Sequence, residues 1–190
     1  MKCASCDTRR CRQGKDCTPR EVQPEYASGD LEMMKAASKI EANFYMEKTR
    51  LEELVLFAKE MGYRKLGVAF CVGLENEART FCKILEKDFI VESVCCKICG
   101  VDKDEYGLDK IREGRETTCN PIAQAMMLNR AGTELNIIVG LCMGHDILFN
   151  KHSEAPVTTF IVKDRVLTHN PAGALYSGYY LKKRFGLEKM

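Results

Sequence analysis

Cysteines are the residues of this chain best suited to chemistry, and they fall into two groups. The first group contains four cysteines within 17 residues, namely Cys3, Cys6, Cys11 and Cys17. The short gap between Cys3 and Cys6 allows two thiolates to bind one ion from a single turn, and the later pair completes a tetrahedron. The segment is too short and polar to bury a core, so bound metal would supply its folding energy. We therefore predict a site for zinc or an iron–sulfur cluster in this segment.

The second group of cysteines follows segments that read as buried strands. Apolar, β-branched runs end at cysteines in residues 65–71, 89–96 and 135–142. Such runs are typical of parallel sheets covered by helices on both faces, and ligands bind beyond the carboxyl ends of the strands in these sheets. We predict a second metal site there, with four ligands: Cys71, Cys96, Cys119 and Cys142. Two more cysteines are reserve ligands, Cys95 and Cys99.

The same edge of the sheet also permits a reaction without metal. Cys119 precedes Asn120 and Pro121, which are a natural N-cap and first residue of a helix. The positive end of that helix favours a thiolate. A thiol-dependent enzyme would use Cys142 or Cys119 as the nucleophile and His145 as the base. A third interpretation is a zinc-stabilised binding module whose basic N-terminal segment contacts a partner.

Helical and strand patterns indicate the elements that must position these residues. Residues 30–61 form two helices that meet near Lys48, because Thr49 and Glu52 have the spacing of a capping box. A strand–helix–strand unit follows over 65–96, and then a long charged loop. Later elements are a helix after Asn120, a strand, a helical turn near His145, a strand that returns as a hairpin over 166–169, and a helix after Asn170. The pattern predicts an α/β fold, a mostly parallel, Rossmann-like sheet with helices on both faces.

Composition limits the remaining possibilities. The 190 residues are 45% hydrophobic and carry a net charge of +2, which suits one α/β domain (21–190) after a cysteine-rich segment (1–20). No run of about 18 apolar residues occurs and no signal segment precedes the first cysteines, so we expect no membrane segment. Eleven cysteines without need of disulfides favour the reducing cytoplasm. The small charge argues against nucleic acid, and any small-molecule or redox partner is unknown.

Several motifs together resemble one known family. They are the cysteine-rich N-terminus and the segments 69–74, 95–97, 119–125, 140–146, 155–159 and 169–171. The chain resembles the cysteine-rich prokaryotic proteins catalogued as domain of unknown function 1847. That resemblance covers nearly the whole chain. It implies metal binding and no established activity.

Overall fold

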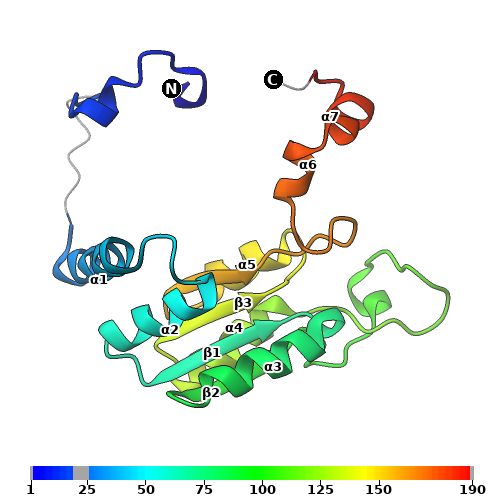
Figure 1. Cartoon of the computed structure of the whole chain (residues 1–190). Helices are drawn as coiled ribbons and strands as arrows, with labels where there is room; N and C mark the ends of the chain where they lie inside the picture. Colours follow the sequence, from blue (N-terminus) through cyan, green and yellow to red (C-terminus); the bar gives the residue numbers. More distant parts are fainter. Residues whose placement is uncertain (1, 19–25, 189–190) are drawn as a thin grey trace.

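A four-stranded parallel sheet forms the centre of the protein (Figure 1). The computed structural model describes residues 2–18 and 26–188. The strands are β1 (Lys65–Phe70), β2 (Ile90–Cys95), β3 (Leu135–Val139) and β4 (Val157–Ile161), in the order β2-β1-β3-β4. Every pair of neighbours is parallel. The predicted α/β fold with a parallel sheet is therefore confirmed.

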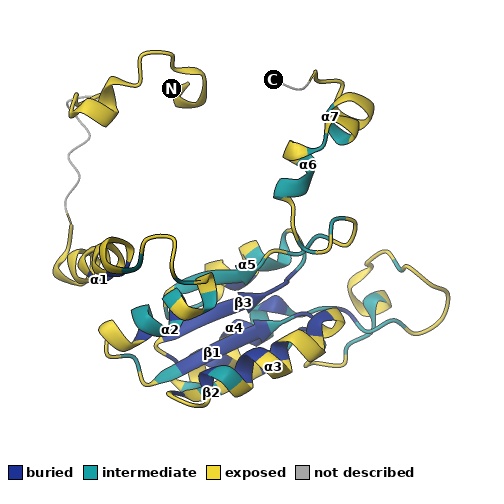
Figure 2. Ribbon diagram, viewed as in Figure 1, coloured by how far each residue is buried: buried dark blue, intermediate teal, exposed yellow. Residues whose placement is uncertain are grey.

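Helices cover both faces of this sheet, as the continuous apolar strands predict. On one face α2 (Arg50–Glu60) and α3 (Glu75–Leu85) pack against β1 and β3. On the other face α4 (Pro121–Ala131) and α5 (His145–His152) form a second apolar cluster with the strands. Figure 2 shows that the two central strands, β1 and β3, are the most deeply buried of the sheet, and β3 is buried at every residue.

The predicted helix pair near the start of the domain is confirmed. Helix α1 (Ser28–Phe44) is followed by α2, whose N-cap Thr49 forms a capping box with Glu52. The Thr49 hydroxyl accepts a hydrogen bond from the Glu52 amide, and the Glu52 carboxylate accepts one from the Thr49 amide. This reciprocal cap fixes where α2 begins.

The segment after β4 differs from the prediction. The hairpin expected over 166–169 is wrong, because residues 165–169 form a turn. The Asp164 carboxylate accepts hydrogen bonds from the amides of Val166 and Leu167, which closes the chain into this turn. The helix expected after Asn170 is divided at Ser177 into α6 (Ala172–Tyr176) and α7 (Gly178–Phe185), since Ser177 has an extended backbone and caps α7.

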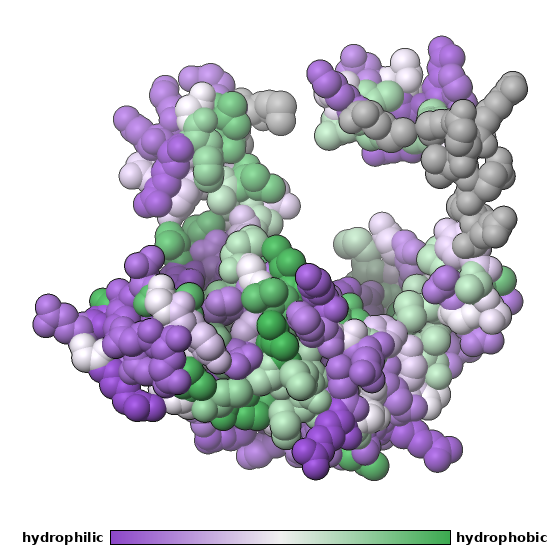
Figure 3. Space-filling view, turned by 180° about the vertical axis from the view of Figure 1, so that it is seen from behind, coloured by the Kyte–Doolittle hydropathy of each residue, from purple (hydrophilic) through white to green (hydrophobic). Residues whose placement is uncertain are grey.

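Four short 3-10 turns complete the described part of the chain: η1 (Cys3–Ser5), η2 (Arg10–Gln13), η3 (Val72–Leu74) and η4 (Lys103–Tyr106). None of the helices in residues 2–18 and 26–188 has the length and hydrophobicity needed to span a bilayer. Figure 3 shows the molecule from behind, where charged side chains dominate the surface and apolar ones interrupt it.

Candidate functional site: a row of thiols at the carboxyl edge of the sheet

The strand order gives this sheet one topological switch point. From β1 the chain crosses to β2 at one edge of the sheet, whereas from β3 it crosses to β4 at the opposite edge. The direction of the connections therefore reverses between β1 and β3. The crevice beyond the carboxyl ends of β1 and β3 is where ligands bind in such folds. Cys71 directly follows β1, and Cys142 lies shortly after β3. These two cysteines, predicted from the sequence as site residues, therefore lie where ligands bind in such folds.

Three of the predicted thiols are linked to one another. Cys71 follows β1, Cys96 follows the neighbouring β2, and Cys119 lies just before α4. The sulfur atoms of Cys96 and Cys119 share a hydrogen bond at 3.7 Å. Cys96 lies close enough to Cys71 to lower the pKa of Cys71, and His145, at the start of α5, lies close enough to Cys119 to lower the pKa of Cys119. The result is a row with the order Cys71, Cys96, Cys119, His145, which we call the thiol row.

Backbone hydrogen bonds, rather than the sulfurs, hold the row together. The Cys96 amide donates to the Phe70 carbonyl at 2.9 Å, so Cys96 stays beside the end of β1. The Cys96 carbonyl accepts from the Asn120 amide at 2.8 Å, so the start of α4 stays beside the end of β2. The Val72 amide donates to the Cys96 sulfur at 3.4 Å. The Asn120 side chain caps α4 by accepting from the Ala123 amide at 2.9 Å.

The direction of the pKa shift alternates along the three thiols of the row. The hydrogen bond from Cys96 lowers the pKa of Cys71 to about 5 against the opposing effect of burial, with smaller contributions from the Gly73 amide and Lys163. Cys96 and then His145 lower the pKa of Cys119 to about 4. The pKa of Cys96 is raised, because it is buried and lies between two neighbours that favour the thiolate. The hydrogen bond with Cys119 raises the pKa of His145.

The remaining predicted thiols at this edge are placed differently. The guanidinium of Arg165 hydrogen-bonds the Cys142 sulfur at 2.9 Å. Cys95 is half-buried and packs against the apolar cluster on the α4 face. Cys99 is exposed, and its sulfur accepts a hydrogen bond from the Asn120 side chain at 3.3 Å. The structure thus brings Cys71, Cys96 and Cys119 into hydrogen-bonded contact and holds Cys142 in a separate pair.

Two cations of the site were missed in the sequence. Lys163 hydrogen-bonds Cys71, and Arg165 hydrogen-bonds Cys142. Both follow β4, so their position after a strand end was a signal that could have identified them. Lys163 directly precedes Asp164, whose carboxylate closes the turn, and Arg165 directly follows it, so one short segment lies near thiols that follow two different strands.

The N-terminal cysteines lie apart from the thiol row. Cys3, Cys6, Cys11 and Cys17 are all exposed, and the Cys6 amide donates to the Cys3 carbonyl at 3.2 Å across a 3-10 turn. The Cys6 sulfur lies 3.6 Å from the Thr8 hydroxyl, whose hydrogen bond lowers the pKa of Cys6. Within residues 2–18 and 26–188, no three or more His, Cys, Asp or Glu side chains are grouped as they would be around a metal ion. The N-terminal metal site and the binding-module alternative stay predictions.

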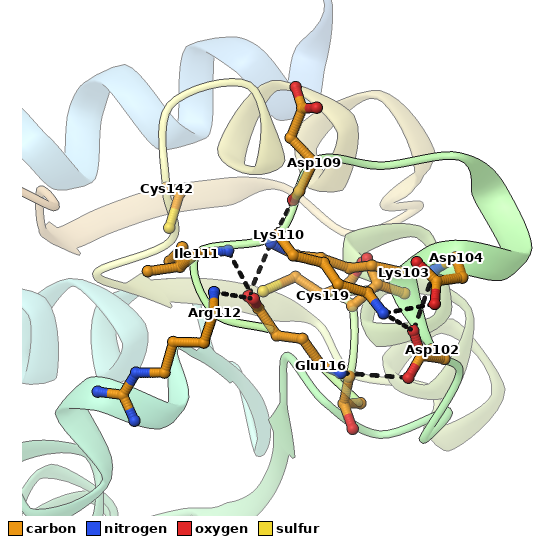
Figure 4. A network of polar contacts seen from close by, with 12 residues as sticks. Asp102, Lys103, Asp104, Asp109, Lys110, Ile111, Arg112, Glu116, Cys119 and Cys142 are labelled. Carbon is orange, nitrogen blue, oxygen red and sulfur yellow. Dashed lines mark hydrogen bonds and ion pairs between the residues drawn. The ribbon is translucent and has the colours of Figure 1, made fainter. Parts of the chain in front are cut away.

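The charged loop between Cys96 and Cys119 is closed by its own contacts. The Thr118 amide donates to the Val101 carbonyl at 2.8 Å, and an antiparallel bridge joins Asp102 to Thr117. Figure 4 shows the polar network inside the loop together with Cys119 and Cys142. In that network Lys110 pairs with Asp102 at 3.1 Å. The loop therefore forms a defined structure beside the thiol row.

Comparisons with known proteins agree with the resemblance inferred from the motifs. The family described as "Protein of unknown function (DUF1847)" matches residues 11–160. An uncharacterised protein of Methanocaldococcus jannaschii is 56% identical over 188 residues, covering 96% of this chain and 97% of that protein. No solved structure matches the chain. The chain belongs to the family of proteins of unknown function designated DUF1847.

Proposed function

We propose that the protein is a thiol-dependent enzyme in which Cys119 is the reactive thiolate and His145 its proton-exchanging partner. The Cys119 sulfur lies 3.7 Å from the Cys96 sulfur, just before α4 at the carboxyl edge of a parallel sheet, and this geometry carries the proposal. His145, at the start of α5, lowers the pKa of Cys119. A thiolate beside a histidine is the activated form of cysteine in nucleophilic catalysis. This is the metal-free alternative that the sequence left open, with Cys119 favoured over Cys142.

The surroundings of Cys119 suit that role in two further ways. Cys119 is half-buried, so it is more accessible to a reagent than the buried Cys96. It precedes an 11-residue helix, α4, whose N-terminus favours negative charge. Cys96 and Lys97 also favour the thiolate. The cysteine content favours a reducing compartment such as the cytoplasm, where these thiols would stay reduced.

Alkylation of Cys119 across a pH series tests the proposal. Full-length protein is treated with iodoacetamide in the presence of a chelator, and peptide mass spectrometry gives the rate for each cysteine. We expect the Cys119 rate to stay constant as the pH falls toward the pKa of about 4 and to decline below it, because the thiolate is the nucleophile. In urea-unfolded protein the same peptide should titrate near the ordinary value of about 8.5.

His145→Gln should slow this alkylation at mildly acid pH, because loss of the imidazolium raises the pKa of Cys119. His152→Gln is the matched control, since it removes an exposed histidine from the other end of α5. If folded and unfolded protein show the same pH profile at Cys119, the proposal is wrong.

A metal site is the second candidate function, and one distance favours it. The Cys96 and Cys119 sulfurs lie 3.7 Å apart. Two thiolates on one tetrahedral zinc, each about 2.3 Å from the metal, lie about 3.8 Å apart. Cys71 and His145 supply a third and fourth donor of the right chemistry, once both side chains turn toward the pair. Zinc bound there would act as a Lewis acid, or an iron–sulfur cluster would carry electrons.

Elemental analysis and absorption spectra of anaerobically purified protein test this candidate. We expect zinc or iron at two equivalents per chain, as the two predicted cysteine groups require. Replacing Cys96 and Cys119 together with serine should remove one equivalent, and deleting residues 1–20 should remove the other. Cys82→Ala is the control, because Cys82 is buried in the core at α3. Metal-free full-length protein would exclude both sites.

A further inference from the structure

We infer that Cys96 and Cys119 form a reversible disulfide, with Cys96 as the resolving thiol, and that the substrate class is a small-molecule disulfide. This inference rests on the Cys119 nucleophile proposed above and adds a reaction, a second residue and a substrate class. The sulfur–sulfur distance of 3.7 Å carries it.

An attacking thiol must be accessible to its substrate, whereas a resolving thiol need not be. Cys119 and Cys96 differ in exposure in this way. Cys96 is 2% exposed, so a disulfide in solution cannot reach its sulfur. Cys119 is half-buried and so is the more accessible of the two. A disulfide bond is about 2.05 Å long, so the two sulfurs must approach by about 1.7 Å. The 2.8 Å hydrogen bond between the Asn120 amide and the Cys96 carbonyl keeps the two backbones together while the side chains turn.

Residues 97–118 connect the two cysteines, and we call this segment the clasp. Its two ends are paired by backbone hydrogen bonds, Thr118 to Val101 at 2.8 Å and Lys103 to Glu116 at 3.0 Å. The Lys97 ammonium adds a hydrogen bond to the Thr117 carbonyl. Because the paired ends lead directly into Cys96 and Cys119, closure of the clasp fixes how far apart those residues lie.

Ion pairs close the clasp from within (Figure 4). Lys110 pairs with Asp102 at 3.1 Å and with Asp104, and donates to the Gly114 carbonyl at 2.8 Å. The side chains of Lys110 and Asp102 are only 19% and 14% exposed. Charges withdrawn from water in this way are screened less than surface pairs. Lys110 is therefore the strongest candidate for a positioning residue that acts on the thiols through the clasp.

The reaction balances with a disulfide RSSR as the only oxidant. The Cys119 thiolate attacks one sulfur of RSSR, forms a mixed disulfide with it and releases RS⁻. Cys96 then attacks the Cys119 sulfur, the second RS⁻ leaves, and the proton of Cys96 passes to that leaving thiolate. The protein is oxidised by two electrons to the Cys96–Cys119 disulfide, and RSSR is reduced to two thiols. A dithiol reverses both steps.

Oxidised glutathione, added to full-length protein with a chelator present, tests the order of these steps. Peptide mass spectrometry of samples quenched over time should show a transient glutathione adduct at Cys119, followed by the Cys96–Cys119 disulfide. In Cys96→Ser the adduct should persist. A wild-type adduct that persists, or a disulfide from Cys119 to any other cysteine, would overturn Cys96 as the resolving thiol.

Lys110→Met tests the clasp. We expect the adduct to form at the wild-type rate but to close to the disulfide about tenfold more slowly or worse, since misplacement by about 1 Å can cost that much. Lys39→Met is the control, because it breaks another lysine–carboxylate ion pair, Lys39–Glu60 (2.8 Å), which joins α1 and α2. Glu116→Gln should also slow closure, because it breaks the Lys103–Glu116 ion pair (2.7 Å) inside the clasp, and Lys110→Arg should restore it in part. Urea unfolding of each variant reports whether the fold is intact.

The possible failures are separable. If Cys119 does not react with oxidised glutathione, both the nucleophile and the disulfide are refuted. If Cys119 reacts but Cys96 does not resolve the adduct, only the disulfide inference fails. If Lys110→Met closes as fast as Lys39→Met, the clasp does not position the thiols.

Discussion

Single residues decide the chemistry of the thiol row through what lies beside each sulfur. Cys96 keeps its proton because it is buried between two thiols that favour the thiolate. Cys119 loses its proton because Cys96 and His145 both hydrogen-bond it. That Cys71, Cys96 and Cys119 lie at one edge of the sheet was predictable from strand ends and a helix start. Their order in the row was not, since it depends on which side chains touch.

Gly140, directly after β3, is a residue at which the backbone near the site tolerates no side chain. Its φ is +67°, and an added Cβ would overlap the side chain of Leu74. We predict that Gly140→Ala lowers the free energy of unfolding by about 1–3 kcal/mol more than Gly132→Ala does, because overpacking adds to the backbone strain. Urea denaturation measures both values.

Gly132→Ala is the matched control for that comparison. Gly132 has nearly the same φ, +66°, but nothing lies within 4 Å of an added Cβ. This variant should lose only the strain of a left-handed alanine, about 1–2 kcal/mol. Equal decreases in the free energy of unfolding for Gly132→Ala and Gly140→Ala would show that the Leu74 side chain moves aside without loss of stability.

At the scale of elements, strand ends were the reliable signal. β1 and β2 end at Phe70 and Cys95, directly before the thiols expected to follow them. The contact of Arg165 with Cys142 could not be predicted, because it depends on the turn after β4, where the sequence favoured a hairpin. Periodicity predicts what is buried in a strand or helix, whereas side-chain acceptors such as Asp164 decide how a turn closes.

Helix α4 presents Cys119 to its neighbours, and its N-cap is therefore predicted to matter for reactivity. Asn120→Ala should lower the free energy of unfolding by about 1 kcal/mol through loss of the cap. It should also slow alkylation of Cys119 at mildly acid pH, because the first turn of α4 frays beside the thiolate. Unfolding in urea and alkylation rates measure the two effects.

Thr49→Ala provides the comparison at another helix. It removes the cap of α2, on the opposite face of the sheet, and should cost about 1 kcal/mol as well. Its Cys119 rate should match that of the wild type. If both variants slow alkylation equally, the effect comes from general loss of stability and not from α4.

For the molecule as a whole, continuous apolar strands were enough to predict a parallel sheet between two helical layers. They were not enough to predict the strand order, which requires knowing that the chain crosses β1 after β2, so that β3 pairs with the other edge of β1. That order explains the site, because β1 has β2 and β3 as neighbours and so Cys71 lies beside Cys96. The N-terminal cysteines add a separate group with its own predicted chemistry.

The backbone scaffolding of Cys96 has an evolutionary consequence. Its amide and carbonyl bind Phe70 and Asn120, so the junction of three segments does not require sulfur at this position. Exchange of one atom of the side chain, sulfur for oxygen or selenium, would leave the junction in place. The nucleophilicity and redox potential of the side chain at this position would change. Descendants of this architecture can therefore acquire new reactivity by point substitution, without rebuilding the backbone junction that holds the reactive side chain.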